Sequence, residues 1–179
     1  MELSEFINTG IKAIQRGVVD RKSPYRLPVL STTLKNKVFQ RIVVARSFDE
    51  KNMRLTVFTD SASKKCQQLQ EHPDCALLFW DSRKKMQIQV SGKANFVDET
   101  DSYWSKLSDR QKREYSINPI SGTRIGSSSS YDYKSKEVRF AVLIIECLKL
   151  DILILDPEGH KRAGCLLEGG VREEFWMSP

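Results

Sequence analysis

The sequence has few of the residues that bind metals or form disulfides. It contains two histidines and four cysteines in 179 residues. The cysteines are widely spaced and make no C-x-x-C pair: Cys66, Cys75, Cys147 and Cys165. Metal sites and disulfide frameworks both need such residues at characteristic spacings. The sequence therefore predicts neither a metal nor a disulfide, and a reducing compartment suits it.

Long apolar runs are also missing. No stretch approaches the roughly 18 apolar residues that a membrane helix needs. Residues 1–5 lack the basic region and apolar core of a secretory signal. We therefore expect a cytoplasmic protein with no membrane partner. Apolar residues make up 40% and charged residues 29% of the chain, which predicts one globular domain over residues 1–179.

The common glycine patterns of nucleotide-binding folds are absent, since neither G-x-G-x-x-G nor the P-loop occurs. The net charge is +6, and its longest basic run is only Arg83-Lys84-Lys85. No zinc-finger, basic-zipper or RNA-recognition pattern is present. Diffuse charge of this size is typical of a solvated surface. A nucleic-acid or polyanion binder thus remains a minor alternative, and we expect no nucleic-acid partner.

Apolar periodicity predicts helices at 3–19, 63–71, 100–107 and 108–116. It predicts strands at 25–33, 38–45, 54–59, 75–80, 86–97, 138–145, 148–155, 160–167 and 174–177. Residues 47–52 are expected to form a polar turn, Gly92 a bulge, and residues 118–133 the longest loop. Because most strands are linked by hairpins, this order predicts an α+β, mainly antiparallel barrel with appended helices.

The stretch Leu55–Lys65 reads L-T-V-F-T-D-S-A-S-K-K and runs from a strand into a helix. Lys64 and Lys65 fall in the first helical turn, where the positive end of the helix dipole disfavours cations. The hydroxyls of Thr59 and Ser63 lie beside them in the sequence. Strand, small polar turn, helix N-terminus and two lysines together indicate a phosphate cradle. An ordinary surface turn with two solvated lysines fits this stretch equally well.

Four segments occur in an order and at separations that are typical of one family. They are R-I-V-V-A-R at 41–46, F-T-D-S-A-S-K-K at 58–65, A-L-L-F-W at 76–80 and Q-I-Q-V-S-G-K-A at 87–94. Together they resemble the pyridoxamine 5′-phosphate oxidase-like family of flavoproteins. The resemblance implies a split β-barrel that binds FMN at the interface of a homodimer. It also favours the phosphate of FMN as the ligand of the cradle.

The resemblance implies FMN contacts for several residues. Ser63, Lys64 and Lys65 would hold the phosphate, which needs several cations and hydroxyls. Gln87 would reach the isoalloxazine from the other subunit. The remaining implied FMN contacts are Arg41, Ile42, Val43, Val44, Arg46, Phe58, Thr59 and Arg162.

The match to the true oxidases is weaker on the substrate side. The implied substrate contacts are Tyr115, Thr123 and His160. Pro119 occupies the place of a substrate-binding arginine, and an aliphatic residue within 153–155 replaces a tryptophan near the flavin. His160 and Arg162 also fit a solvated turn. FMN binding is therefore better supported than oxidation of pyridoxamine 5′-phosphate.

Two flavin functions follow from this resemblance. The first is an FMN-dependent oxidoreductase that acts on a small substrate, with electrons passing through the flavin. The second is a non-catalytic protein that binds or sequesters flavin. The absence of the substrate-binding arginine would then reflect the absence of a substrate. No general base can be named from the sequence, so no catalytic residue is assigned.

Overall fold

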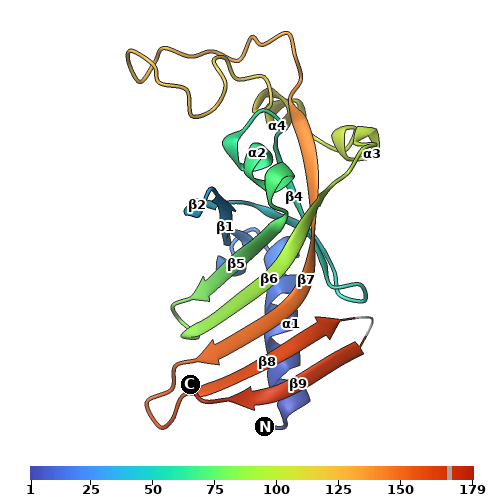
Figure 1. Cartoon of the computed structure of the whole chain (residues 1–179), viewed down its shortest axis with the longest axis vertical. Coiled ribbons are helices and arrows are strands. Elements are labelled where there is room, and N and C mark those ends of the chain that lie inside the picture. Colours follow the sequence, from blue (N-terminus) through green and yellow to red (C-terminus); the bar gives the residue numbers. More distant parts are fainter. Residues whose placement is uncertain (169–170) are drawn as a thin grey trace.

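The computed structural model describes residues 1–168 and 171–179 and contains one nine-stranded sheet with flanking helices (Figure 1). The strands are β1 (Val29–Leu34), β2 (Lys37–Ile42), β3 (Ala45–Asp49), β4 (Arg54–Asp60), β5 (Asp74–Asp81), β6 (Met86–Phe96), β7 (Phe140–Ile154), β8 (Lys161–Glu168) and β9 (Val171–Met177). The helices are α1 (Leu3–Val19), η1 (Pro24–Arg26), α2 (Lys64–Glu71), α3 (Asp101–Trp104) and α4 (Asp109–Arg113).

Strand β7 is where the sheet divides. The strand order is β2-β1-β5-β6-β7-β4-β3, and every pair is antiparallel. One edge of β7 pairs with β6, while its other edge pairs first with β4 and then, from Lys149 onward, with β8. The sheet is therefore split and not closed. This arrangement confirms the predicted mainly antiparallel α+β fold.

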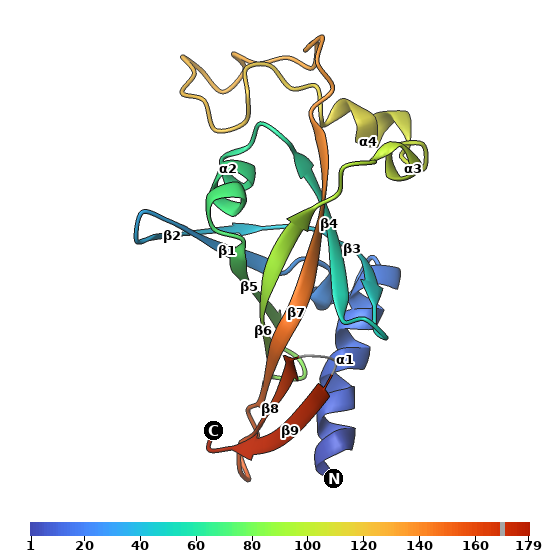
Figure 2. The ribbon, with the colours of Figure 1, turned by 45° about the vertical axis from the view of Figure 1, so that its right-hand side comes forward.

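Helix α1 covers one face of the sheet. Phe6, Ile7, Ile11 and Ile14 recur at helical spacing and are buried in the core. The helix packs against β3, β8 and β9, and Figure 2 shows it lying along the sheet. Its bounds match the predicted helix 3–19.

The predicted strand 38–45 is wrong, because the segment forms two strands. Strand β2 ends at Ile42, and β3 begins at Ala45 and continues through the expected turn at 47–52 as far as Asp49. Between them the backbone N–H of Val43 donates to the carbonyl of Pro28, and the Val43 side chain is buried. The chain crosses here from one edge of the sheet to the opposite edge, so no single strand could contain both ends.

The two predicted strands 138–145 and 148–155 are wrong as well, since β7 runs unbroken through both. Its pairing with β6 continues across Glu146 and Cys147, with a register shift between Ser91 and Gly92. A Cβ on Gly92 would collide with the backbone carbonyl of Glu146, so only glycine fits this bulge. The bulge predicted at Gly92 is confirmed.

Smaller differences occur elsewhere. Residues 25–33 do not form one strand, because Ser23 caps the turn η1 by accepting from the N–H of Tyr25 at 3.3 Å. Helices α3 and α4 are shorter than the predicted 100–107 and 108–116 and contain no buried residue. Helices this short gain little stability without a buried face. The long loop between α4 and β7 lies at the end of the molecule opposite to both termini (Figure 1).

Candidate functional site

The N-terminal turn of α2 brings two of the predicted phosphate contacts, Ser63 and Lys65, together with Thr59. Ser63 is the N-cap residue in an extended conformation, and its side chain makes no cap hydrogen bond. Instead, the ammonium of Lys65 donates to Ser63 Oγ at 3.2 Å and to Thr59 Oγ1 at 2.9 Å. Thr59 and Ser63 are buried, whereas Lys64 is exposed. The lysine that faces the protein is therefore Lys65.

Arg41 reaches the same region from β2. Its guanidinium donates to Thr32 Oγ1 at 2.6 Å and to Gln68 Oε1 at 2.7 Å. The Thr32 hydroxyl donates in turn to Gln68 Oε1 at 2.6 Å. The positive charge of Arg41 is close enough to act on Lys65, where it adds to the effect of burial in lowering the pKa of the ammonium. We call Arg41, Thr59, Ser63 and Lys65 the basic cradle.

The two cations of the basic cradle meet only neutral oxygen atoms. Among the described residues, no ion pair includes Arg41 or Lys65. Burial lowers the pKa of Arg41. Burial and the charge of Arg41 lower the pKa of Lys65, and the carboxylate of Asp60 opposes that shift. Two partly buried cations that no carboxylate of the described residues contacts in an ion pair favour an anionic ligand.

Thr32 and Gln68 belong to this network but were not predicted. Gln68 follows Lys65 by three residues, so both side chains lie on one face of α2, and this spacing was a usable signal. Thr32 has no such signal, because it reaches Gln68 only through the packing of α2 on β1.

Arg46 lies in a second cluster. The pairing of β3 with β4 shifts between Ala45 and Ser47, so Arg46 occupies a bulge that redirects its side chain. Its guanidinium lies 5.2 Å from the ring centroid of Phe58. Phe58 and Thr59 are neighbours on β4 and point to opposite faces, so Arg46 lies across the strand from the cradle. Arg46 Nε is buried and has no hydrogen-bond partner within the described part of the chain.

Aromatic side chains surround Arg46. Phe140 packs edge-on against Phe58 at 5.3 Å and against Tyr115 at 4.9 Å between ring centroids. Burial raises the pKa of the Tyr115 phenol, and the charge of Arg46 opposes that rise. A pocket of about 310 Å³ opens beside this cluster and is lined by Arg26, Arg46, Ser47, Phe58, Tyr103, Lys106, Leu107 and Gln111. Its walls are aromatic and cationic.

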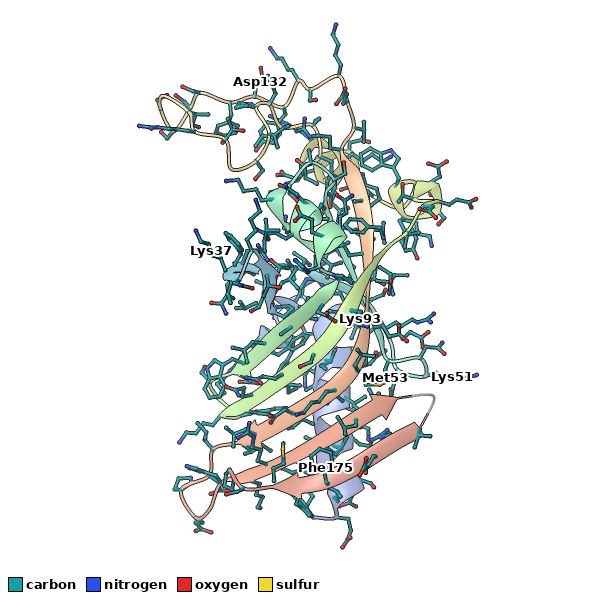
Figure 3. All side chains as sticks on the ribbon, viewed as in Figure 1. Lys37, Lys51, Met53, Lys93, Asp132 and Phe175 are labelled. Atoms are coloured by element: carbon teal, nitrogen blue, oxygen red, sulfur yellow. The ribbon has the colours of Figure 1, made fainter. Side chains whose placement is uncertain are left out.

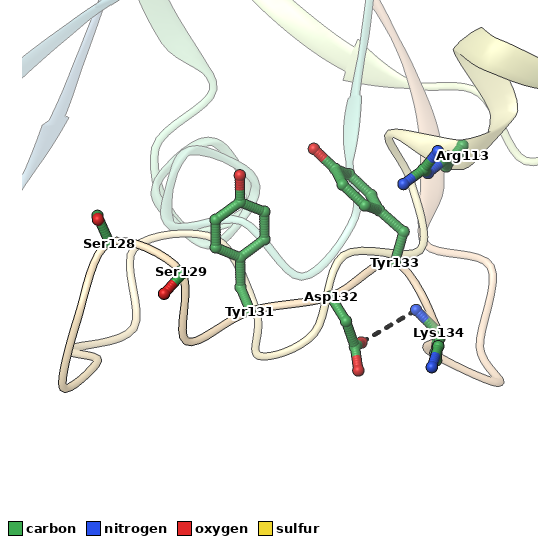
Figure 4. Close-up of a pocket in the computed structure, with 7 residues that line it drawn as sticks. All are labelled: Arg113, Ser128, Ser129, Tyr131, Asp132, Tyr133 and Lys134. Atoms are coloured by element: carbon green, nitrogen blue, oxygen red, sulfur yellow. Dashed lines mark hydrogen bonds between the residues drawn. The ribbon is translucent and has the colours of Figure 1, made fainter.

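Thr123 does not join Tyr115. It lies in the exposed part of the long loop, where its N–H donates to the carbonyl of Ile120 at 3.0 Å. The same loop forms a pocket of about 620 Å³ in which Arg113 lies 4.4 Å from the ring centroid of Tyr133 (Figure 4). This pocket shares no lining residue with the basic cradle.

Gln87 and Arg162 lie on the sheet face turned away from α1. Register places them in one row with Trp80 and Leu153, across β5, β6, β7 and β8. Figure 3 shows the side chains of this region, with Phe175 on β9 labelled. The Arg41 side chain belongs to the other face, because Arg41 pairs with buried Leu30. Within one chain, Gln87 and Arg162 are therefore separated from the cradle. We call this surface the outer sheet face.

The remaining predicted contacts lie apart from the cradle. Arg162 forms a two-pronged ion pair with Asp151, at 2.9 Å and 2.7 Å. The exposed His160 accepts at Nδ1 from the N–H of Asp156 at 3.1 Å and stabilises its own turn. Ile42 is exposed beside the outer sheet face, Val43 is buried, and Val44 is half-buried.

Neither a metal-binding cluster nor a membrane-spanning helix occurs in the described part of the chain. In residues 1–168 and 171–179, no three histidine, cysteine, aspartate or glutamate side chains gather closely enough to hold a metal ion. None of the helices described has the length and apolar character required to cross a bilayer.

Comparison with known proteins agrees with these features. The family model described as "Pyridoxamine 5′-phosphate oxidase, FMN-binding domain" matches residues 9–98, which is half of the chain. The pyridoxine/pyridoxamine 5′-phosphate oxidase of Trichormus variabilis is 32% identical over 79 residues, covering 44% of this chain and 36% of that protein. The chain thus spans little more than a third of such curated relatives. Pyridoxine/pyridoxamine 5′-phosphate oxidase 2 of Arabidopsis thaliana is 24% identical over 161 residues, covering 81% and 80%.

Solved structures share the fold. A pyridoxamine 5′-phosphate oxidase-related, FMN-binding protein from Nostoc punctiforme superposes with a TM-score of 0.78 at 21% identity, covering all of both chains. PhzG from Burkholderia lata, in complex with tetrahydrophenazine-1-carboxylic acid, gives a TM-score of 0.74 at 16% identity, covering 99% of this chain and 90% of PhzG. The fold is thus the open split barrel that the resemblance implied. The chain belongs to the pyridoxamine 5′-phosphate oxidase family of FMN-binding domains, and its cofactor is FMN.

Proposed function

We propose that residues 1–179 form a single FMN-binding split-barrel domain that acts as an oxidoreductase on a small anionic substrate. The observation that carries the proposal is that Arg41 and Lys65 both donate to neutral oxygen atoms. No carboxylate among the described residues forms an ion pair with either side chain. A phosphate group would supply the missing negative charge. The basic cradle therefore fits the phosphate end of FMN.

The residues of the cradle have complementary tasks in this proposal. Arg41 and Lys65 would neutralise the phosphate, while the hydroxyls of Thr59 and Ser63 donate to its oxygens. Lys64, which is exposed beside them, would add long-range attraction. Val43 and Val44 would back the cofactor with apolar surface. When bound, FMN supplies two-electron redox chemistry.

We further propose that two copies of the chain form a homodimer through the outer sheet face. This face carries the exposed or half-buried apolar side chains Ile42, Leu78, Trp80, Leu153 and Phe175. Gln87 and Arg162 project from the same face, so Gln87 of the partner subunit would reach a flavin held in the cradle. The separation of these groups within one chain supports a site shared by two chains.

For the substrate, Arg46 and Tyr115 are the best-supported contacts. Arg46 has an unpartnered buried Nε, and Arg26 and Lys106 line the same pocket. A small anionic substrate with an apolar ring would match these cations and the aromatic wall of Phe58 and Tyr103. Thr123 and His160 would contribute only from exposed segments.

The exposed position of Thr123 favours a second candidate function. Together with proline at position 119, it leaves Tyr115 without the polar partners that the resemblance implies for the true oxidases. A protein that binds flavin without turnover would need no such partners. Flavin binding is common to both candidates, and turnover separates them.

The visible spectrum of the purified protein tests FMN binding, because bound oxidised flavin makes the protein yellow. Titration with FMN and riboflavin then tests the cradle, since only FMN carries the phosphate. We expect FMN to bind at least about tenfold more tightly, because a charge-assisted hydrogen bond contributes about 1.5–3 kcal/mol. Equal affinities would contradict the cradle. Anaerobic bleaching of the flavin by amine or alcohol substrates with a phosphate group would support the oxidoreductase over the non-catalytic protein.

A further inference from the structure

Arg139 is a buried arginine that was not among the predicted site residues. It precedes β7, and only 8% of its surface is exposed. Its Nε lies 3.3 Å and 3.4 Å from the two carboxylate oxygens of Asp60. A guanidinium at this depth is costly unless its donors are satisfied, and here they are satisfied by two separate segments.

The first segment is the turn that presents the basic cradle. Asp60 ends β4, and its Oδ1 accepts from the N–H of Ala62 at 2.8 Å. The backbone carbonyl of Asp60 accepts from the N–H of Ser63 at 3.0 Å and from the thiol of Cys66 at 3.2 Å. Asp60 therefore fixes the backbone of residues 60–63, from which Ser63 and Lys65 extend.

The second segment runs from α4 into the long loop. The guanidinium of Arg139 donates to the carbonyl of Ile117 and, at 3.1 Å, to Ser135 Oγ. Its backbone N–H donates to the carbonyl of Tyr115 at 3.0 Å, and its carbonyl accepts from the N–H of Ser61 at 3.1 Å. Arg139 thus holds both ends of the long loop and the cradle turn at once.

Through Asp60 and Arg139, the electrostatics of the basic cradle depend on the conformation of the long loop. The carboxylate of Asp60 is near enough to raise the pKa of Lys65 against its burial. If Arg139 moved away with the loop, Asp60 would face the anion site as an unpaired carboxylate and would repel a phosphate. A phosphate in the cradle therefore favours the conformation in which Arg139 pairs with Asp60 and the loop is held.

We propose that Arg139 is a positioning residue that couples FMN binding to the conformation of residues 116–135. The coupling is reciprocal: FMN favours the held loop, and the held loop strengthens FMN binding. The inference rests on the proposed phosphate site of FMN. It adds a regulatory link between the cofactor and the segment that follows Tyr115.

The rate of trypsin cleavage after Arg124 measures how firmly the loop is held, because Arg124 lies in its exposed part. Mass spectrometry identifies the cut, and flavin fluorescence gives FMN affinity. In the wild-type protein we expect saturating FMN to slow this cleavage about tenfold, within the usual range of coupling between two sites. Arg139→Gln should abolish the slowing and weaken FMN about tenfold, because Asp60 is left unpaired.

The double variant Asp60→Asn/Arg139→Gln separates a loss of coupling between FMN and the loop from a direct effect on the FMN site. With no unpaired charge beside the cradle, its FMN affinity should return to within about twofold of wild type. FMN should still fail to slow its cleavage, because the link is absent. Arg172→Gln is the matched control, since Arg172 pairs with Glu174 on β9 and should leave both readouts unchanged.

The outcomes distinguish this inference from the proposed function. A wild-type protein that binds no FMN would contradict the proposed function itself. FMN binding with undiminished slowing of cleavage in Arg139→Gln would overturn only the coupling. If Arg139→Gln fails to fold, Asp60→Asn alone decides: loss of the slowing supports the coupling, and wild-type slowing overturns it.

Discussion

Arg41 on β2 donates at 2.7 Å to the side-chain oxygen of Gln68 on α2, a neutral partner, although its guanidinium is partly buried. Buried arginines normally pair with carboxylates, because an uncompensated charge away from water is costly. Among the described residues, Lys65 also has neutral partners, because its ammonium donates to the hydroxyls of Thr59 and Ser63. The region is therefore arranged to receive a negative charge from outside the chain.

Lys65→Met is expected to weaken FMN by about 10- to 100-fold, because the ammonium contributes about 1.5–3 kcal/mol to a charge-assisted contact. Lys64→Met is the matched control. It removes the same charge one residue away from an exposed position and should cost less than about fivefold. Fluorescence titration measures both. Equal losses in the two variants would show that general charge, and not the cradle geometry, holds the cofactor.

FMN affinity should fall as the pH rises toward the ordinary lysine range, and the fall should begin below 10.5. Burial and the nearby charge of Arg41 lower the pKa of Lys65, so the ammonium loses its proton earlier than a solvated lysine. Phosphate binding needs the protonated form, which sets the sign of the effect. For the apoprotein the sign is opposite, because losing the buried charge relieves a destabilising contribution as the pH rises to 10.5.

Lys65→Arg separates this titration from other effects of pH. Its guanidinium keeps its charge over the whole range, so the affinity of this variant should stay level where that of the wild type declines. Isothermal titration with FMN at successive pH values measures the difference. Parallel declines in the two proteins would assign the effect to another group.

Leu78→Glu is expected to convert the proposed dimer to a monomer and to reduce FMN binding at the same time. Leu78 lies on the outer sheet face, and a charge buried between two copies of this face would be uncompensated. Val19→Glu, at an exposed position near the end of α1, is the control and should remain dimeric. Sedimentation velocity gives the mass. A monomeric wild-type protein would contradict the shared site.

Gly92→Ala should lower the free energy of unfolding by about 1–3 kcal/mol, the usual cost of forcing an added methyl into a packed region. The added Cβ would meet the carbonyl of Glu146 on β7, and backbone cannot move as easily as a side chain. Gly126→Ala is the control, because a Cβ added there would have no neighbouring atom within 4 Å and its φ is not in the left-handed region. Urea unfolding measures both variants, and equal stabilities would show that β7 can shift.

Several features could be read from the sequence because they depend on neighbours along the chain. The apolar spacing of Phe6, Ile7, Ile11 and Ile14 located α1, and Ser63 marked the start of α2. The hydroxyls and lysines of Leu55–Lys65 already suggested an anion site. Helical spacing also holds Gln68 beside Lys65, a local signal that the sequence carries as well.

Other features depend on contacts between distant strands and could not be read locally. Arg41 and Arg46 are close in sequence, yet the crossing at Val43 and the bulge at Arg46 send them to different clusters. The continuity of β7 follows from its pairing with β6 across Glu146, which no local pattern reveals. The link from Arg139 to Asp60 joins residues 79 positions apart.

The sequence by itself determined where α1 and α2 lie, and it determined that Ser63 and Lys65 lie at a helix start beside Thr59. Those properties follow from side-chain periodicity and from the geometry of one helical turn. Only the tertiary structure decided that the charge of Arg41 acts on Lys65, while Gln87 and Arg162 lie on the face of the sheet opposite to Arg41. Strand register sets which face of a sheet a side chain occupies, and register is fixed by pairing between distant strands.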